Sequence, residues 1–222
     1  MDDEEKKRAA LIRIKSEWKK AQKSPIPGIT TQPIGESNDD IFHWTGSMMG
    51  PEGSPYQGGI FDIDIVLPRD YPFKPPLCRF TTKLFHPNIS PEAYHPIDRP
   101  AGGKINVDIL KESWGPALTI PTVVLSIQSL LTDPNPDDTL NPDASAMLRH
   151  DHGAYNREVQ KWVRLYATPQ AAAAAQPAGL GRYAAPGKHV VSASTLKLAS
   201  NFSHPAAPQR IHLRRRTRSQ RR

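Results

Sequence analysis

The chain has 222 residues, of which 37% are hydrophobic and 23% charged, a composition that supports one packed domain with an appendage. Its 23 prolines exclude a coiled-coil protein, and its single cysteine, Cys78, excludes an internal disulfide and a cysteine-based zinc site. The net charge of +7 arises in residues 171–222, which hold ten of the 29 basic residues and no acidic one. Residues 1–170 hold the other 19 basic residues and 22 acidic residues, so the body of the protein is not a basic nucleic-acid-binding domain.

The first segment predicts one amphipathic helix. Acidic and basic residues lie four positions apart at its start, and acidic side chains suit a helix N-terminus. An apolar stripe follows at helical spacing, formed by Leu11, Ile14, Trp18 and Ala21. Because Pro25 and Pro27 cannot continue a helix, we expect it to end near Lys23.

Four strand-like runs follow, at residues 29–34, 41–49, 60–67 and 77–82. Apolar side chains take every second position of the third run, as expected for a strand with one buried face; they are Phe61, Ile63, Ile65 and Leu67. Turn residues rich in glycine and proline separate the second and third runs, which predicts an antiparallel meander of four strands.

Residues 86–115 carry little periodic signal and much proline and glycine. A loop of that length inside a compact domain is typical of a functional region. Helical periodicity resumes at Pro121, and we expect helices at about 121–131, 142–150 and 153–167. The order of one helix, four strands, an irregular segment and further helices predicts an α+β fold.

The composition changes near residue 169. The residues that follow are rich in Ala, Ser, Gly and Pro, and the last thirteen contain seven arginines. We therefore expect a globular domain over residues 1–168 and a disordered basic tail over residues 169–222. The arginines suit a nuclear-import address or contact with a nucleic-acid backbone, and equally an extension without a selected role.

The sequence does not predict a membrane protein. No apolar run approaches the roughly 18 to 20 residues that span a bilayer. Met1 is followed by four acidic residues rather than by the basic and then apolar segments of a secretory signal. We expect a cytoplasmic or nuclear location.

Ordered sequence blocks carry a resemblance to a known family. The blocks are Phe42-His43-Trp44, Gly50-Pro51 with Tyr56-Gln57-Gly58-Gly59, Tyr71-Pro72-Phe73-Lys74-Pro75-Pro76, His86-Pro87-Asn88-Ile89, Val107-Asp108-Ile109-Leu110, Trp114-Gly115-Pro116-Ala117-Leu118-Thr119-Ile120 and Asp133-Pro134-Asn135-Pro136-Asp137-Asp138. In these blocks and in the order of its elements, the chain resembles the ubiquitin-conjugating enzymes over about residues 5–168. The resemblance implies that family's fold, with an N-terminal helix, a four-stranded meander and C-terminal helices.

The resemblance implies a thioester chemistry that this sequence does not support at the expected position. Family members carry ubiquitin on a cysteine directly before the block that begins here at Val107, and that position is Asn106. A carboxamide has no anionic form at neutral pH and forms no thioester. Cys78 is expected to be a buried, inert strand residue and no substitute. Residues 90–104 form a second departure, because the family has only a handful of residues there.

Two further residues match the family's catalytic site. Asn88 matches an asparagine that stabilises the oxyanion of the transfer reaction, and its alternative role is to tie down its own loop. Asp138 matches an acidic position that orients or deprotonates the incoming lysine, and its alternative role is that of a turn carboxylate. We expect His86 to be a packed, hydrogen-bonded histidine rather than a general base.

The resemblance also implies partner surfaces. Phe73, Pro116 and Ala117 match positions where family members contact RING-type ligases, with turn and core packing as the alternative. Arg13 and Lys15 resemble the basic positions that dock the activating enzyme, and otherwise form a solvated helix face. The implied partners are ubiquitin or a ubiquitin-like modifier, a RING-type ligase and an active conjugating enzyme. No cofactor and no metal is expected.

Three functions remain open. The first is a non-catalytic relative of the conjugating enzymes that binds ubiquitin, a ligase or an active conjugating enzyme, because Asn106 is no nucleophile. The second is an active transferase, if the natural transcript encodes cysteine at position 106 without the inserted residues or if another nucleophile takes its place. The third makes the arginine tail the functional element, in contact with nucleic acid, and the domain its carrier.

Overall fold

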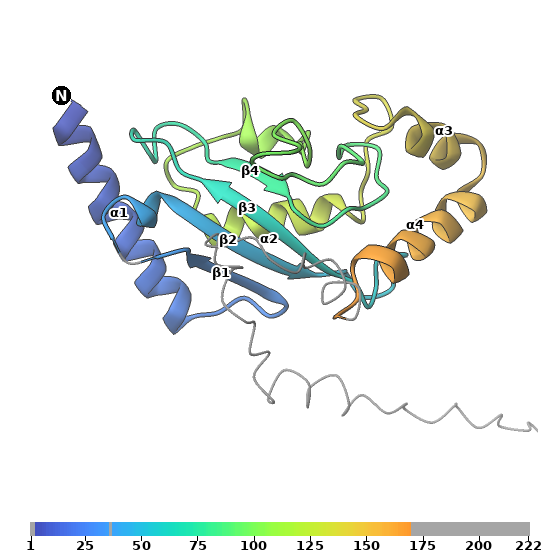
Figure 1. Ribbon diagram of the computed structural model, residues 1–222, viewed down its shortest axis with the longest axis horizontal. Helices are drawn as coiled ribbons and strands as arrows, with labels where there is room; N and C mark the ends of the chain where they lie inside the picture. The colour runs from blue at the N-terminus through green and yellow to red at the C-terminus, as the bar shows by residue number, and fades with distance from the viewer. Residues whose placement is uncertain (1–2, 36, 170–222) are drawn as a thin grey trace, which may run out of the picture. The chain divides into compact units, whose positions relative to one another are not determined.

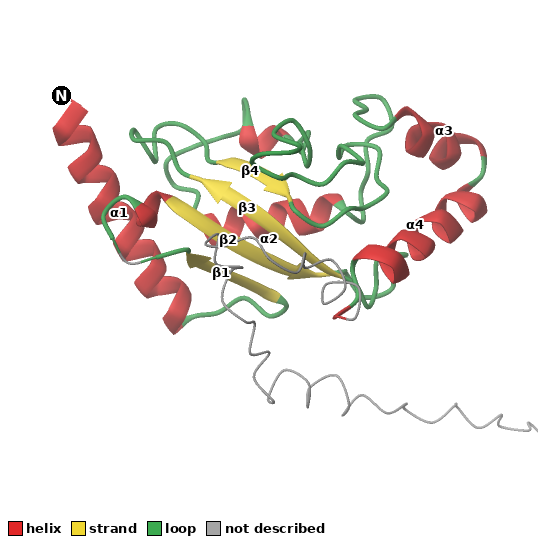
Figure 2. Cartoon of the chain, in the orientation of Figure 1, coloured by secondary structure: helices red, strands yellow, loops and turns green. Residues whose placement is uncertain are grey.

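The structure of the protein, a computed structural model, describes residues 3–35 and 37–169. In this part of the chain a four-stranded antiparallel sheet is combined with four α-helices and two short 3-10 helices (Figures 1 and 2). The predicted α+β fold is therefore confirmed. No helix within these ranges has the length and hydrophobicity needed to cross a membrane. The predicted disordered tail lies outside the described residues, apart from Pro169.

The sheet is the predicted meander, in which each strand pairs with the next along the chain. Its strands are β1 (Ile29–Pro33), β2 (His43–Met49), β3 (Ile60–Val66) and β4 (Leu77–Phe80). Every second side chain of β3 is buried, as its apolar alternation predicted. The pairing register puts Trp44 opposite Ile65 and Ile65 opposite Cys78, so these core side chains share one face of the sheet.

The expected start of the second strand was wrong. Ile41 and Phe42 belong to the 3-10 helix η1 (Asp40–Phe42) instead of β2. Both side chains are buried, at 1% and 6% exposure, which two successive positions of a one-faced strand cannot provide. The turn is stabilised by Ser37, whose hydroxyl accepts from the Asp40 N–H at 3.0 Å.

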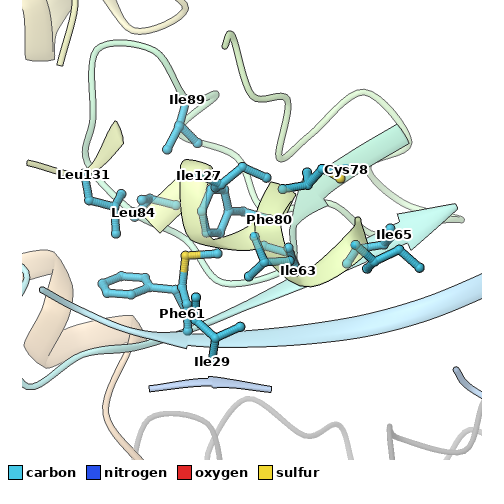
Figure 3. Close-up of a cluster of buried hydrophobic side chains, with 14 of the residues drawn as sticks. Ile29, Phe61, Ile63, Ile65, Cys78, Phe80, Leu84, Ile89, Ile127 and Leu131 are labelled. Carbon is cyan, nitrogen blue, oxygen red and sulfur yellow. The ribbon is translucent and has the colours of Figure 1, made fainter. Parts of the chain in front are cut away.

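The helices lie on one face and at the two ends of the sheet. They are α1 (Asp3–Lys23), α2 (Ile120–Leu130), α3 (Pro142–His150) and α4 (His152–Tyr166). Helix α2 packs across one face of the sheet, whereas α1 lies at one end and α3 and α4 at the other (Figure 1). The core therefore forms between the sheet and α2, where Ile127 and the flanking Leu131 meet Phe61, Ile63 and Phe80 (Figure 3).

The buried face of α1 differs from the predicted stripe. Ile14 is buried as expected, but its fully buried neighbours on the helix are Ala10 and Glu17. The predicted stripe residues Leu11 and Trp18 pack only partly against the core. Helical periodicity found the correct side of α1, but it did not mark Glu17 because the apolar pattern excludes a carboxylate.

The inserted residues 90–104 pack along the free edge of β4. The Tyr94 N–H donates to the Phe80 carbonyl at 2.7 Å, and the Phe80 N–H donates to the Gly103 carbonyl at 2.9 Å. Gly103 has a φ of +64°, and a Cβ there would lie 2.2 Å from the Phe80 carbonyl oxygen, so the close approach requires glycine. The insertion thus covers a sheet edge that would otherwise be unpaired.

Candidate functional site

Asn88 is buried, at 1% exposure, in the loop that follows β4. Its Nδ2 donates to the carbonyls of Asn135 at 2.6 Å and Asp138 at 2.7 Å, and its Oδ1 accepts from the Asn135 N–H at 2.8 Å. All of these partners belong to the loop between α2 and α3. One side chain therefore joins two loops that are about 50 residues apart in the sequence, and both hydrogens of its amide are already donated.

His86 is a fully buried residue of the loop that carries Asn88. Its Nε2 lies 2.9 Å from the Leu130 carbonyl, and its Nδ1 accepts from the Asn88 N–H at 3.0 Å. Burial lowers the pKa of His86 to about 4, although the bond to the Leu130 carbonyl favours the protonated form. The ring is neutral at pH 7 and both nitrogens have partners, as expected for a packed structural histidine.

Asn106 is brought directly beside Asn88. Its main-chain N–H donates to the Asn88 carbonyl at 2.8 Å, and its Nδ2 donates to the Asp138 carbonyl at 3.3 Å. Its Oδ1 accepts a short hydrogen bond from Lys111 Nζ. The structure therefore unites the three predicted site residues Asn88, Asn106 and Asp138, with the Asp138 carbonyl as the acceptor that the two asparagines share.

Lys111 is a functional-site residue that the sequence reasoning missed. Its Nζ lies 4.0 Å from the Asp138 carboxylate as well as against Asn106, so one ammonium bridges both side chains. The side chains of Lys111 and Asp138 are 44% and 59% exposed, so water screens the pair. A lysine five residues after Asn106 was visible in the sequence, but it fits no periodic pattern that places it at the site.

The two ends of the segment 90–104 are paired with each other. Ile89 and Ile105 form an antiparallel bridge, and the Ser90 N–H donates to the Lys104 carbonyl at 2.9 Å. The segment between them therefore begins and ends at this bridge. Asn106 consequently lies next to Asn88 even though residues 90–104 separate the two segments.

Cys78 is not near this site. Its side chain points into the core between the sheet and α2, at 3% exposure (Figure 3). Burial raises the pKa of the Cys78 thiol, with a smaller contribution from the Asp64 charge. The expected burial of Cys78 is confirmed, and the raised pKa of its thiol supports the expected low reactivity. The described ranges also contain no group of three or more histidine, cysteine or acidic side chains placed to hold a metal ion.

The predicted ligase residues lie on two neighbouring loops. Phe73 is 64% exposed, and Pro116 and Ala117 are exposed on the loop before α2. The Trp114 indole N–H donates to the Pro72 carbonyl at 2.9 Å and joins the two loops. We call Phe73, Pro116 and Ala117, the residues for which ligase contact is predicted, the ligase surface.

The two predicted docking residues of α1 have different surroundings. Arg13 donates through Nε to Glu17 and through Nη2 to the Leu118 carbonyl at 2.9 Å, so its guanidinium is engaged inside the fold. Lys15 is exposed and donates to Asn38 Oδ1 at 3.2 Å. Lys15 is therefore available to a partner at the cost of one surface hydrogen bond, whereas the Arg13 side chain is 32% exposed and already makes two hydrogen bonds.

A sequence model of the ubiquitin-conjugating enzymes matches residues 13–163. The chain belongs to the ubiquitin-conjugating enzyme family. The E2 domain of a Toxoplasma gondii ubiquitin-conjugating enzyme is 38% identical, with 71% of this chain and 98% of that chain covered and a TM-score of 0.61. A Plasmodium yoelii protein described as a ubiquitin-conjugating enzyme is 40% identical, covers 72% of this chain and 96% of its own, and has a TM-score of 0.62.

Family membership confirms the resemblance that the sequence blocks carried. It places this ubiquitin-conjugating-enzyme-like domain in the ubiquitin conjugation pathway, whose members work with ubiquitin, an activating enzyme and ligases. The similar region covers the part of the chain in which the sheet, α2 and the site around Asn88 lie.

Proposed function

We propose that the chain is a non-catalytic relative of the ubiquitin-conjugating enzymes that acts through its domain, residues 1–168, by binding ubiquitin, a ligase or an active conjugating enzyme. Asn106 carries this proposal, because the family blocks align it with the thioester cysteine. Its carboxamide is hydrogen-bonded to Lys111 and to the Asp138 main chain. A carboxamide attacks no thioester at neutral pH, and these bonds give it a structural use.

The neighbouring site residues have structural roles in this proposal. Asn88 ties the loop between α2 and α3 to its own loop, and its three side-chain hydrogen bonds support that role. Asp138 contributes its carbonyl to both asparagines, and its exposed carboxylate lies 4.0 Å from Lys111 Nζ.

Partner binding in this proposal uses the exposed residues. The ligase surface offers Phe73 as an aromatic anchor beside the small step formed by Pro116 and Ala117, a combination that suits a RING-type domain. Arg13 and Lys15 are the candidate docking residues for the activating enzyme, and Lys15 is the more accessible because the Arg13 guanidinium also bonds Glu17 and Leu118.

The alternative is an active transferase whose natural transcript encodes cysteine at position 106. One observation favours it: the Ile89–Ile105 bridge and the bond from Asn106 N–H to the Asn88 carbonyl keep the site in order despite the insertion. A thiol at position 106 would therefore enter a formed site next to Asn88.

Loading with ubiquitin separates the two functions. The native protein is incubated with activating enzyme, ATP and ubiquitin and run on a non-reducing gel, with Asn106→Cys as the matched variant. The proposal predicts no adduct on the native protein. A ubiquitin adduct on the native protein that dithiothreitol removes would establish the transferase instead.

A further inference from the structure

Glu17 is a buried carboxylate on α1 that no role described so far uses. It is 4% exposed and is the only acidic residue in the buried class among the described residues. Taking a carboxylate out of water is costly unless charged and hydrogen-bonding partners replace the water. We therefore consider which groups replace water around the Glu17 carboxylate.

Three separate elements donate to this carboxylate. Arg13 Nε, one turn earlier on α1, donates to Oε1. The Tyr71 hydroxyl lies 2.9 Å from Oε1 and 3.0 Å from Oε2, and the main-chain N–H of Ile120, at the start of α2, donates to Oε2 at 2.9 Å. A negative charge at that place also suits the positive N-terminal end of α2.

These donors flank the ligase surface on both of its loops. Tyr71 lies two residues before Phe73, and Ile120 lies three residues after Ala117. The Arg13 guanidinium adds a bond to the Leu118 carbonyl at 2.9 Å, directly next to Ala117. Glu17 thus contacts residues of both segments that carry the ligase surface, and a single carboxylate connects them to α1.

A second link closes the arrangement nearer the surface. The Trp114 indole donates to the Pro72 carbonyl at 2.9 Å, and the Trp114 and Tyr71 rings lie 5.9 Å apart. The Trp114 bond is part-buried, whereas the bonds from Tyr71 and Ile120 to Glu17 are buried, where water competes less.

We propose that Glu17 is a positioning residue for RING-type ligase binding: its carboxylate sets the spacing between Phe73 and the Pro116–Ala117 step before the partner arrives. The inference rests on the proposed function for the ligase contact, but the geometric part concerns only this chain. A preset surface binds more tightly because less ordering is needed on association.

Glu17→Gln is the sharpest variant because it keeps the shape of the side chain. Arg13 and the Ile120 N–H can only donate, so the amide NH2 must face one of them without a bond. We expect the main-chain amide NMR signals of Phe73 and Ala117 to shift. We also expect an isolated RING domain from an active ligase to bind roughly tenfold more weakly, the equivalent of one lost hydrogen bond to a charged group.

Two control variants separate positioning from loss of stability. Val159→Ala removes buried methyl groups from α4, at the other end of the sheet, and destabilises the fold without touching either loop. Glu158→Gln makes the same chemical change where the carboxylate binds only Lys161 and Trp162 of its own helix. Both should leave the Phe73 and Ala117 signals and the RING affinity unchanged.

Tyr71→Phe provides a second test if Glu17→Gln does not fold. It removes one donor and leaves Arg13 and Ile120 on the carboxylate, so the Phe73 signal should shift while the Ala117 signal stays. Unshifted Phe73 and Ala117 signals in a folded Glu17 or Tyr71 variant would overturn the proposal, as would full RING affinity of Glu17→Gln. If no RING domain binds the wild-type chain, the ligase contact is wrong and the NMR signals alone decide the positioning role.

Discussion

Lys111 contacts the side chain at position 106, and this contact has a measurable consequence in the variant Asn106→Cys. The new thiol would stand beside the Lys111 ammonium, which now donates to the Asn106 Oδ1. A nearby cation favours the thiolate over the thiol. We therefore expect the new thiol to be more acidic with Lys111 present than in the double variant Asn106→Cys/Lys111→Met.

The magnitude follows from the exposure of the pair. Two unit charges about 4 Å apart in water interact by about 1 kcal/mol, which raises the thiolate fraction below its titration midpoint about fivefold. Lys111 is 44% exposed, so the value for water applies, and the Asp138 carboxylate at 4.0 Å from Nζ opposes part of it. The thiolate of a more acidic thiol is also a weaker nucleophile. The alkylation rate at neutral pH therefore rises only about twofold to threefold.

The assay is the rate of iodoacetamide alkylation as a function of pH, followed by intact mass. The chain offers a clean background, because Cys78 is buried and burial raises the pKa of its thiol. The parent protein should therefore not react. Superimposable pH profiles of the single and double variants would refute the placement of Lys111 against position 106.

Three further predictions concern stability and the inserted segment. The folded protein holds His86 neutral with a pKa near 4, below its value of about 6.5 in an unfolded chain, so the unfolded state binds more protons between these values. The free energy of unfolding that His86 contributes is complete above about pH 6.5 and falls by up to roughly 3 kcal/mol as the pH is lowered towards 4. In His86→Gln, the urea midpoint should therefore fall less steeply than in the wild type as the pH is lowered. Asn88→Ala breaks three buried hydrogen bonds and should cost about 2 to 4 kcal/mol in urea denaturation, with faster hydrogen exchange at the Asn135 amide; unchanged exchange there would contradict the loop-tying role. Gly103→Ala should release the insertion from β4 and speed exchange at the Phe80 amide, whereas Gly53→Ala, also at positive φ but with open space around it, should not.

Local pattern predicted much of the fold. The alternation of Phe61, Ile63 and Ile65 predicted a one-faced strand, and that face is buried against α2. Helix α3 has the predicted bounds because its start is encoded locally: Asn141 caps the Ala144 N–H, and Pro142 suits the first turn. Features that depend on residues close together in the sequence were therefore predictable without the structure.

Long-range polar contacts were not predictable in the same way. Glu17 lies on the buried side of α1 because Tyr71 and Ile120, which are 54 and 103 residues away, supply its hydrogen bonds. Lys111 reaches Asn106 because the chain between them turns back through η2 (Asp108–Leu110). Helical or strand periodicity contains no signal for such partners, since it reports burial of apolar side chains alone.

The central claim is that the native chain carries no ubiquitin through a sulfur atom at position 106. Intact mass of the protein purified from its own cells, after incubation with activating enzyme, ATP and ubiquitin under non-reducing conditions, tests it most directly. We expect the protein to keep the mass that it has before incubation, with no ubiquitin added. A species heavier by one ubiquitin that a reducing agent returns to the starting mass would contradict it.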